Sequence, residues 1–285
     1  MYRSVTRSKR LPTPSLRPPQ QKTIDPFAST RADGEWVYGH NWVSLCFLAT
    51  HPLWGVIALS LRSLLYVREK DVPSLAAKYG WKFRTKLELA VHLVTWFVTS
   101  VRSLGVECSI WLVTDGAYAG RPVLKPLTDL GVVVFSRLRK DACLFDLPAE
   151  PRPGQRGRHC IYGSRRIRLA KLAASTDGWE SMTYPCRGSM VTREYKTFLA
   201  TSRLVSGTIR VAIVRFEDGG WAAYFCTDAQ VNVRDILETV AARWAIEKSQ
   251  AYCVQRYTFP REGRSAYIGS RRIVASGTMV PAMPA

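Results

Sequence analysis

The N-terminal part of the chain has the hydrophobic pattern of β-strands. Residues 41–49 are nearly all apolar, β-branched or aromatic, which predicts a buried strand. After a turn at His51 and Pro52 the pattern returns in residues 54–61, and residues 64–67 predict a third, short strand. Strands joined by so short a turn predict an antiparallel hairpin or meander.

The period of the apolar positions then changes. From 84 to 103 apolar residues recur every three or four positions, which predicts a helix that buries one side. A short apolar strand at 108–113 runs directly into Thr114-Asp115-Gly116. A helix at 121–130 and a buried strand at 131–136 follow. The predicted order is β-β-β-α-β-α-β.

Strand patterns return after a basic segment rich in Pro and Gly. Strands are predicted at 195–204, 208–216 and 221–227, with Glu217-Asp218-Gly219-Gly220 as the hairpin turn between the last two. A helix is predicted over 232–249, and no clear periodicity follows it. The alternation of helices and strands predicts an α/β protein.

The composition is that of a folded protein with a strong positive charge. Hydrophobic residues make up 47% of the 285 residues, which suffices for a substantial core and argues against disorder over most of the chain. Lys and Arg number 41 against 22 Asp and Glu, a formal net charge of +19. Such a charge attracts polyanions, and nucleic acid is the commonest of them, although charge that serves only solubility is the alternative.

Cysteine usage and hydropathy bear on location. No two of the seven cysteines form a Cys-x-x-Cys pair, and an odd number cannot all pair within one chain, which argues against a zinc site or a disulfide framework. The longest apolar run, 42–61, is interrupted by His51 and Pro52, and the N-terminus lacks the apolar stretch of a signal peptide. We therefore expect a cytoplasmic protein with no membrane partner.

Two acidic residues are the best candidates for chemistry. Asp115 ends an apolar strand, a position that faces the ligand crevice in open α/β sheets, although a turn or helix-capping Asp is the alternative. Glu247 lies on the last predicted helix four residues after Arg243, which alone is an ordinary surface ion pair. Together the two carboxylates can converge over one sheet edge and hold two Mg²⁺ ions, and Arg243 would then contact a phosphate.

Several stretches of the chain carry a resemblance to a known family. They are 38–43 (Tyr-Gly-His-Asn-Trp-Val), 83–90 (Phe-Arg-Thr-Lys-Leu-Glu-Leu-Ala), 115–118 (Asp-Gly-Ala-Tyr) with 125–127, 136–142 (Ser-Arg-Leu-Arg-Lys-Asp-Ala), 151–158 (Pro-Arg-Pro-Gly-Gln-Arg-Gly-Arg), 195–228 and 243–247 (Arg-Trp-Ala-Ile-Glu). Over roughly residues 36–248 the chain resembles the DDE-type transposases of bacterial insertion sequences, in the branch whose last motif reads Tyr-x-x-Arg-x-x-x-Glu-x-x-x-x-x-x-Lys.

The resemblance implies a ribonuclease-H-like mixed sheet with flanking helices and a β-rich insertion between the second and third acidic residues. Asp115 would be the second of these and Glu247 the third, and both would hold the two-metal site for Mg²⁺ or Mn²⁺. Arg243 would be the arginine of the motif. The family cuts DNA at transposon ends and joins the freed 3′ ends to target DNA. DNA is then the expected partner, with a homodimer in a synaptic complex, in the nucleoid region of a bacterial cytoplasm.

This interpretation divides the chain into four parts. Residues 1–35 are expected to be a disordered basic arm, 36–136 and 228–250 the catalytic core, 137–227 the basic insertion, and 251–285 a weakly ordered tail. Arginines and a lysine of the insertion are expected to contact DNA phosphates, a solvated basic loop being the alternative: Arg137, Arg139, Lys140, Arg156 and Arg158. Trp179 would either stack on a flipped base or pack within the insertion.

Three departures from the family pattern bear on activity. The first catalytic Asp of the family lies in a strand upstream of Tyr38, where Asp25 is the nearest match. The Tyr and Lys of the last motif fall at Val240 and Val254, and both ends of the chain look unlike the family. We therefore predict a transposase with little or no activity. The alternatives are a non-catalytic DNA-binding remnant and, more remotely, a ribonuclease-H-like nuclease outside transposition.

Overall fold

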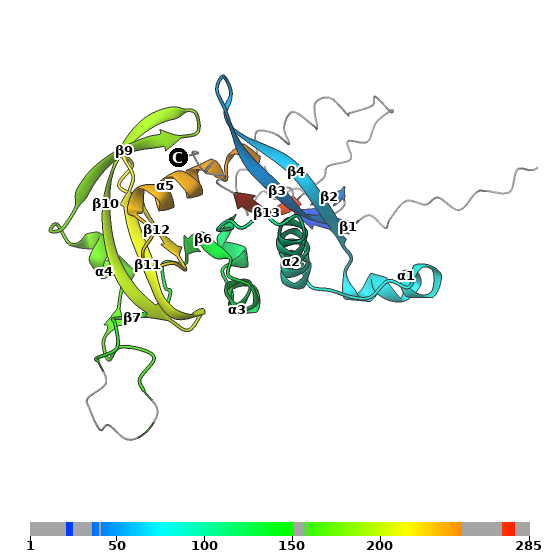
Figure 1. The fold of residues 1–285 in the computed structure, drawn as a ribbon, viewed down its shortest axis with the longest axis horizontal. Coiled ribbons are helices and arrows are strands. Elements are labelled where there is room, and N and C mark those ends of the chain that lie inside the picture. Colours follow the sequence, from blue (N-terminus) through cyan, green and yellow to red (C-terminus); the bar gives the residue numbers. More distant parts are fainter. Residues whose placement is uncertain are drawn as a thin grey trace, which may run out of the picture.

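The fold is a mixed α/β arrangement around one large, mostly antiparallel sheet (Figure 1). The computed structural model describes residues 21–24, 36–39, 41–150, 157, 159–246 and 270–276. Its eleven-stranded sheet has the order β4-β3-β13-β5-β6-β12-β11-β10-β7-β8, with β9 paired to β10. The α/β prediction is confirmed at this level.

The sheet begins with a long hairpin. β3 (Asn41–His51) pairs antiparallel with β4 (Gly55–Tyr66). The prediction of two separate strands at 54–61 and 64–67 was wrong, because Arg62 and Ser63 keep the ladder intact by pairing with β3. A short 3₁₀-helix, η1 (Glu69–Asp71), and α1 (Val72–Tyr79) follow and were not predicted.

α2 (Lys86–Ser103) confirms the helix predicted from the apolar period. Thr85 caps its start: the Glu88 backbone N–H donates to the Thr85 hydroxyl at 3.2 Å, and the Thr85 backbone N–H donates to the Glu88 carboxylate at 2.7 Å. This reciprocal pair satisfies two backbone donors that a helix start otherwise leaves open. The buried side, with Leu89, Leu93 and others, packs on the sheet.

A parallel β-α-β unit forms the centre of the sheet. It consists of β5 (Trp111–Thr114), the 3₁₀-helix η2 (Gly116–Tyr118), α3 (Arg121–Asp129) and β6 (Val133–Leu138). β5 and β6 pair in parallel, and α3 crosses between them. The predicted helix and strands are confirmed, with β5 beginning three residues later than the strand predicted from 108.

The second half of the chain extends the same sheet. Its elements are β7 (Leu144–Phe145), β8 (Arg166–Ile167), α4 (Leu169–Ala174), β9 (Glu180–Cys186), β10 (Ser189–Ser202), β11 (Val205–Arg215), β12 (Trp221–Cys226) and α5 (Val233–Ala242). β12 pairs with β6, so these strands continue the central sheet. The three predicted strands, their hairpin turn and the last helix are confirmed, although α5 is shorter than predicted.

Two pairings involve segments for which the sequence predicts no strand. β1 (Gln21–Ile24) pairs with β2 (Trp36–Gly39). β13 (Ser270–Ser276) lies between β3 and β5, parallel to the first and antiparallel to the second. The apolar run within β13 is too short for the sequence to predict a strand there. Backbone pairing with β3 on one side and β5 on the other stabilises its extended conformation.

The core has two layers, one on each face of the sheet. α2, α3 and α4 pack on one face, and α5 packs on the other together with β9 (Figure 1). We call these the α2 face and the α5 face. Within the described residues, no helix is long and apolar enough to cross a membrane.

Candidate nucleic-acid interface

Asp115 lies at the end of a central strand and begins a short helix. Its carboxylate accepts a hydrogen bond from the backbone N–H of Ala117 at 3.4 Å, so the helix-capping alternative is observed. The side chain is exposed. A Cβ on Gly116 would lie 3.1 Å from the carbonyl oxygen of Arg137, so the glycine allows η2 to approach β6 closely. The carboxylate therefore combines a local structural role with an open position at the sheet edge.

Arg137 lies beside Asp115 on the α5 face. In the parallel ladder of β5 and β6, Thr114 is level with Ser136. The next residues, Asp115 and Arg137, are therefore level too, because Asp115 keeps an extended backbone with φ −66° and ψ 150°. Side chains alternate along a strand, and Phe135, two residues before Arg137, is buried in the core under α5. Register and alternation thus bring a carboxylate and a guanidinium group to one edge.

The turn between β9 and β10 presents a second arginine. Cys186 pairs with Ser189, so the loop consists of Arg187 and Gly188 alone. Their φ angles are 55° and 92°, the positive pair of a type I′ turn, in which Asn-Gly is preferred. Among the described residues Arg187 is the one non-glycine residue with positive φ. An arginine at such a costly position indicates that its side chain has a role there.

Trp244, just after α5, lies against two guanidinium groups. The Cζ atom of Arg187 is 3.7 Å from the centre of the Trp244 ring, and that of Arg243 is 5.1 Å from it. Stacking uses the flat face of a guanidinium group, while its N–H donors lie in the plane and point outward. These contacts join the β9–β10 turn to the end of α5, two segments far apart in the sequence.

Tyr224 links the arginines. It pairs with Arg137 in the ladder of β12 and β6. Burial has the largest effect on its phenol and raises its pKa, whereas the charges of Arg137, Arg243 and Arg187 act to lower that pKa. The pairing with Arg137 places that guanidinium group beside Tyr224, and the charges of the other two also act on its phenol. We call Arg137, Arg187, Arg243, Tyr224 and Trp244 the arginine cluster, a positively charged site on the α5 face at the end of β5.

Two other predicted DNA contacts have partners within the chain. Arg139 donates from Nε and Nη2 to the two carboxylate oxygens of Asp141, at 2.9 Å each. This hydrogen-bonded pair raises the pKa of Arg139 and lowers that of Asp141. Lys140 Nζ lies 4.8 Å from the centre of the Trp221 ring. Both basic side chains are exposed, but the charge of Arg139 is already balanced locally.

Trp179 packs within the protein. Its indole N–H donates to the carbonyl oxygen of Ser175 at 2.8 Å. Lys196 Nζ and Arg215 Cζ lie 4.6 Å and 4.0 Å from the centre of its ring. The ring is thus held by neighbouring side chains, which confirms the packed alternative for this tryptophan over the one in which it stacks on a flipped base.

Part of the predicted site falls beyond the residues that the structure describes. Asp25, Arg156, Arg158 and Glu247 all lie there. In the described part of the chain, no three His, Cys, Asp or Glu residues are arranged to hold a metal ion. The two-metal site expected from Asp115 and Glu247 therefore stays a prediction.

The sequence analysis missed three members of the cluster. Arg187 precedes Gly188, and an x-Gly pair between two strands is a hairpin signal that points to it. Tyr224 stands two residues before the buried Cys226, so strand alternation places it on the same face as the α5 core. Trp244 follows the predicted Arg243 directly. None of these signals reveals that the three meet, because the pairing of β9 with β10 and of β12 with β6 decides it.

No family model matches the chain, and no curated protein matches it. The chemistry of its own side chains is therefore the basis for assigning a function to this chain. The arginine cluster offers donors that suit a phosphate, two aromatic rings beside them, and one carboxylate at the edge. This arrangement has the donors to bind a nucleic-acid backbone, and among its described residues Asp115 is the carboxylate at this edge.

Proposed function

We propose that this chain is a DNA-binding protein of the transposase kind whose strand-cleaving chemistry is impaired. The arginine cluster carries the proposal. Its three guanidinium groups come from a strand end, a hairpin turn and a helix end, and guanidinium groups bind phosphates through paired N–H donors. The net charge of +19 attracts a polyanion, and the ring of Trp244 packs against two of the three guanidinium groups.

The strand next to β5 supports the proposal that strand cleavage is impaired. Two-metal cleavage uses two or three converging carboxylates, of which Asp115 supplies one. The neighbour of β5 is β13, in which Ile273 is level with Thr114, so Arg272 is level with Asp115. The resemblance expects an Asp-bearing strand from upstream of Tyr38 in the core. In this chain the residue of the neighbouring strand at that level is an arginine and not an acidic residue.

The finer fold assignment belongs to the same proposal. A ribonuclease-H-like core with a β-rich insertion is supported by the β3–β4 hairpin before α2 and by the parallel unit of β5, α3 and β6. The insertion, residues 137–227, would contain β7 to β12 and α4, which lie between Asp115 and α5 in the chain. These strands continue the core sheet through the pairing of β12 with β6.

DNA binding as a function of salt tests the proposal. The full chain is compared with a variant in which Arg137, Arg187 and Arg243 are all replaced by Gln. Loss of three phosphate contacts is expected to lower the affinity for duplex DNA at least about tenfold and to reduce the slope of log K against log salt by about 3. The expected effect is large because the three groups act at one place.

A matched control removes three positive charges elsewhere. Arg203 in the β10–β11 turn, Lys70 and Lys125 are exposed and distant from the cluster in the chain, and they are replaced by Gln together. Equal losses in the two triple variants would show that net charge alone drives binding. That result, or unchanged affinity in the cluster variant, overturns the proposed interface.

Cleavage is tested separately with Mg²⁺ or Mn²⁺ and DNA that carries the ends of the proposed transposon. The purified chain is expected to cut little or none of it. Robust cleavage that Asp115→Asn abolishes would overturn the impaired half of the proposal and leave DNA binding intact. Cleavage that ignores terminal inverted repeats would instead indicate a general nuclease.

A further inference from the structure

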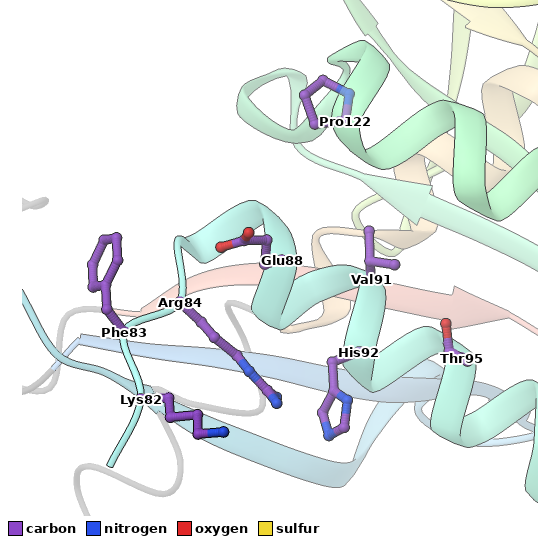
Figure 2. Close-up of a pocket in the computed structure, with 8 residues that line it drawn as sticks. All are labelled: Lys82, Phe83, Arg84, Glu88, Val91, His92, Thr95 and Pro122. Atoms are coloured by element: carbon purple, nitrogen blue, oxygen red, sulfur yellow. The ribbon is translucent and has the colours of Figure 1, made fainter. Parts of the chain in front are cut away.

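A hollow on the α2 face is lined by three segments, two of which contribute basic side chains. It has a volume of about 540 Å³ and lies between the segment that precedes α2, the first turns of α2 and the start of α3. Lys82 and Arg84 come from the segment, and His92 comes from α2. Figure 2 shows these three side chains extending to the same side, with their nitrogen-bearing ends toward one another.

Arg62 of β4 adds a third positive charge beside the imidazole of His92. Its Cζ atom lies 4.9 Å from the centre of the Trp96 ring on α2, which holds the guanidinium group between strand and helix. Burial is the largest cause that lowers the pKa of His92, and the charges of Arg84 and then Arg62 lower it further. Both guanidinium groups are therefore close enough to the imidazole to oppose its protonation.

The nearest carboxylate, that of Glu88, is held mainly by the helix cap, and the charge of Arg84 is the smallest of the causes that lower its pKa. Glu88 lies one turn before His92, but it accepts hydrogen bonds from the backbone N–H and hydroxyl of Thr85 at 2.7 and 2.9 Å. In Figure 2 its carboxylate extends away from the nitrogen-bearing ends of Lys82 and Arg84. Among the ion pairs between described residues, none involves these two side chains.

We infer that this hollow is a phosphate-binding site, formed by Lys82, Arg84 and His92 with Arg62 beside it. Several donors from different directions suit the three outward oxygens of a phosphate better than the two of a carboxylate. A bound phosphate would offset the charges of the lysine and the two arginines and would favour the protonated form of His92. The site is separate from the arginine cluster, because α2 and α5 cover opposite faces of the sheet. It does not rest on the function proposed above.

The experiment follows the imidazole of His92 in the full chain by NMR. The chain has four histidines, and the signal of His92 is the one lost in a His92→Gln variant. Its pKa is measured in chloride and in inorganic phosphate at equal ionic strength. Phosphate is expected to raise it, because a nearby anion stabilises the imidazolium form. His51, stacked on Trp54 in the β3–β4 hairpin, is the internal control and is expected to stay unchanged.

Arg84→Gln separates binding from a general charge effect. Without phosphate it is expected to raise the pKa of His92, because one of the opposing charges is gone. It is also expected to increase the phosphate concentration needed for half of the shift by at least about threefold. Arg203→Gln removes the same charge from an exposed turn and is expected to change neither quantity. Equal responses in the two variants would overturn the site.

Two further ligands identify the source of the phosphate. A nucleoside monophosphate that shifts the His92 signal indicates a free or terminal phosphate, and duplex DNA that shifts it while the monophosphate does not indicates a backbone phosphate. If inorganic phosphate, monophosphate and duplex all leave the signal unchanged, the inference is wrong. The cluster variant lacking Arg137, Arg187 and Arg243 keeps the response to inorganic phosphate even if the proposed DNA interface fails.

Discussion

The two faces of the sheet organise positive charge in different ways. On the α5 face, strand register and a two-residue turn hold Arg137 and Arg187, and Trp244 packs against Arg187 and Arg243. On the α2 face, the basic groups of the hollow come largely from the segment before a helix and from the helix surface. The first arrangement is rigid and carries a carboxylate, Asp115, at its edge.

The difference indicates two kinds of binding. Groups fixed by hydrogen-bonded strands keep their spacing, which suits a repeating backbone such as that of DNA. Groups on a connecting segment adjust to their ligand, which suits a single small anion. Charge counted over the whole chain cannot make this distinction. It depends on which elements carry each side chain.

The largest expected effect comes from removing a buried aromatic ring on either face of the sheet, which tests whether both faces are closely packed. Phe135→Ala on the α5 face and Phe225→Ala on the α2 face each remove a fully buried ring and are expected to lower the free energy of unfolding by about 3–5 kcal/mol. Leu104→Ala, at a position 78% exposed, is expected to change it by less than about 0.5 kcal/mol. Urea denaturation measures all three. A small effect at one phenylalanine only would show that its face is not packed as described.

Thiol labelling tests whether solvent is excluded from the core on the α5 face. Burial raises the pKa of Cys226 to about 12, whereas Cys143 is exposed. Because the thiolate is the reactive form, native Cys226 is expected to react with iodoacetamide at least about a hundredfold more slowly than Cys143. Mass spectrometry of peptides measures both rates, and urea should make them similar. Equal rates in the native protein would contradict the closed core under α5.

Arg187→Asn separates folding from binding on the α5 face. Asn is favoured at this position of a type I′ turn, so the variant is expected to be as stable as the parent or up to about 1 kcal/mol more stable. It removes one guanidinium group from the cluster, so the affinity for DNA is expected to fall about threefold or more. Denaturation and DNA titration measure the two quantities. A variant that loses stability and keeps its affinity would show that the arginine serves the turn.

The smallest expected effect is a pH dependence from the α2 face. The folded protein holds the pKa of His92 below its ordinary value of 6.5, so the unfolded chain binds this proton more readily. The contribution of His92 to stability is therefore complete above pH 6.5 and is lost as the pH falls below it. His92→Gln is expected to flatten the curve of unfolding free energy against pH between about 5 and 7. A curve that keeps its slope in the variant would place the titrating group elsewhere.

Local patterns predicted the elements whose burial is one-sided and regular. The apolar period located α2, because it is set by residues within a few positions of one another. β10, β11 and β12 were found from β-branched and apolar runs bounded by turn residues. The exposed edge strand β4 was divided in two, because its middle residues pair through the backbone and bury little.

The candidate site was predicted only in part, because its geometry is non-local. Asp115 and Arg243 were identified from their places on a strand end and a helix. Arg187 was not, although its backbone conformation is the most unusual of the group. In the sequence Arg187 stands in a segment for which no turn was predicted. Its side chain reaches Trp244 only because β9 pairs with β10.

By itself, the sequence determined the α/β class, most of the helices and strands, and the strong positive charge. These follow from periodicity, composition and motifs, which are properties of neighbouring residues. The tertiary structure alone decided that β13 lies beside β5, that Arg187 and Arg243 meet at Trp244, and that a second basic group lies on the opposite face. Strand order and register determine these contacts, because backbone hydrogen bonds join segments whose order along the chain does not reveal their pairing.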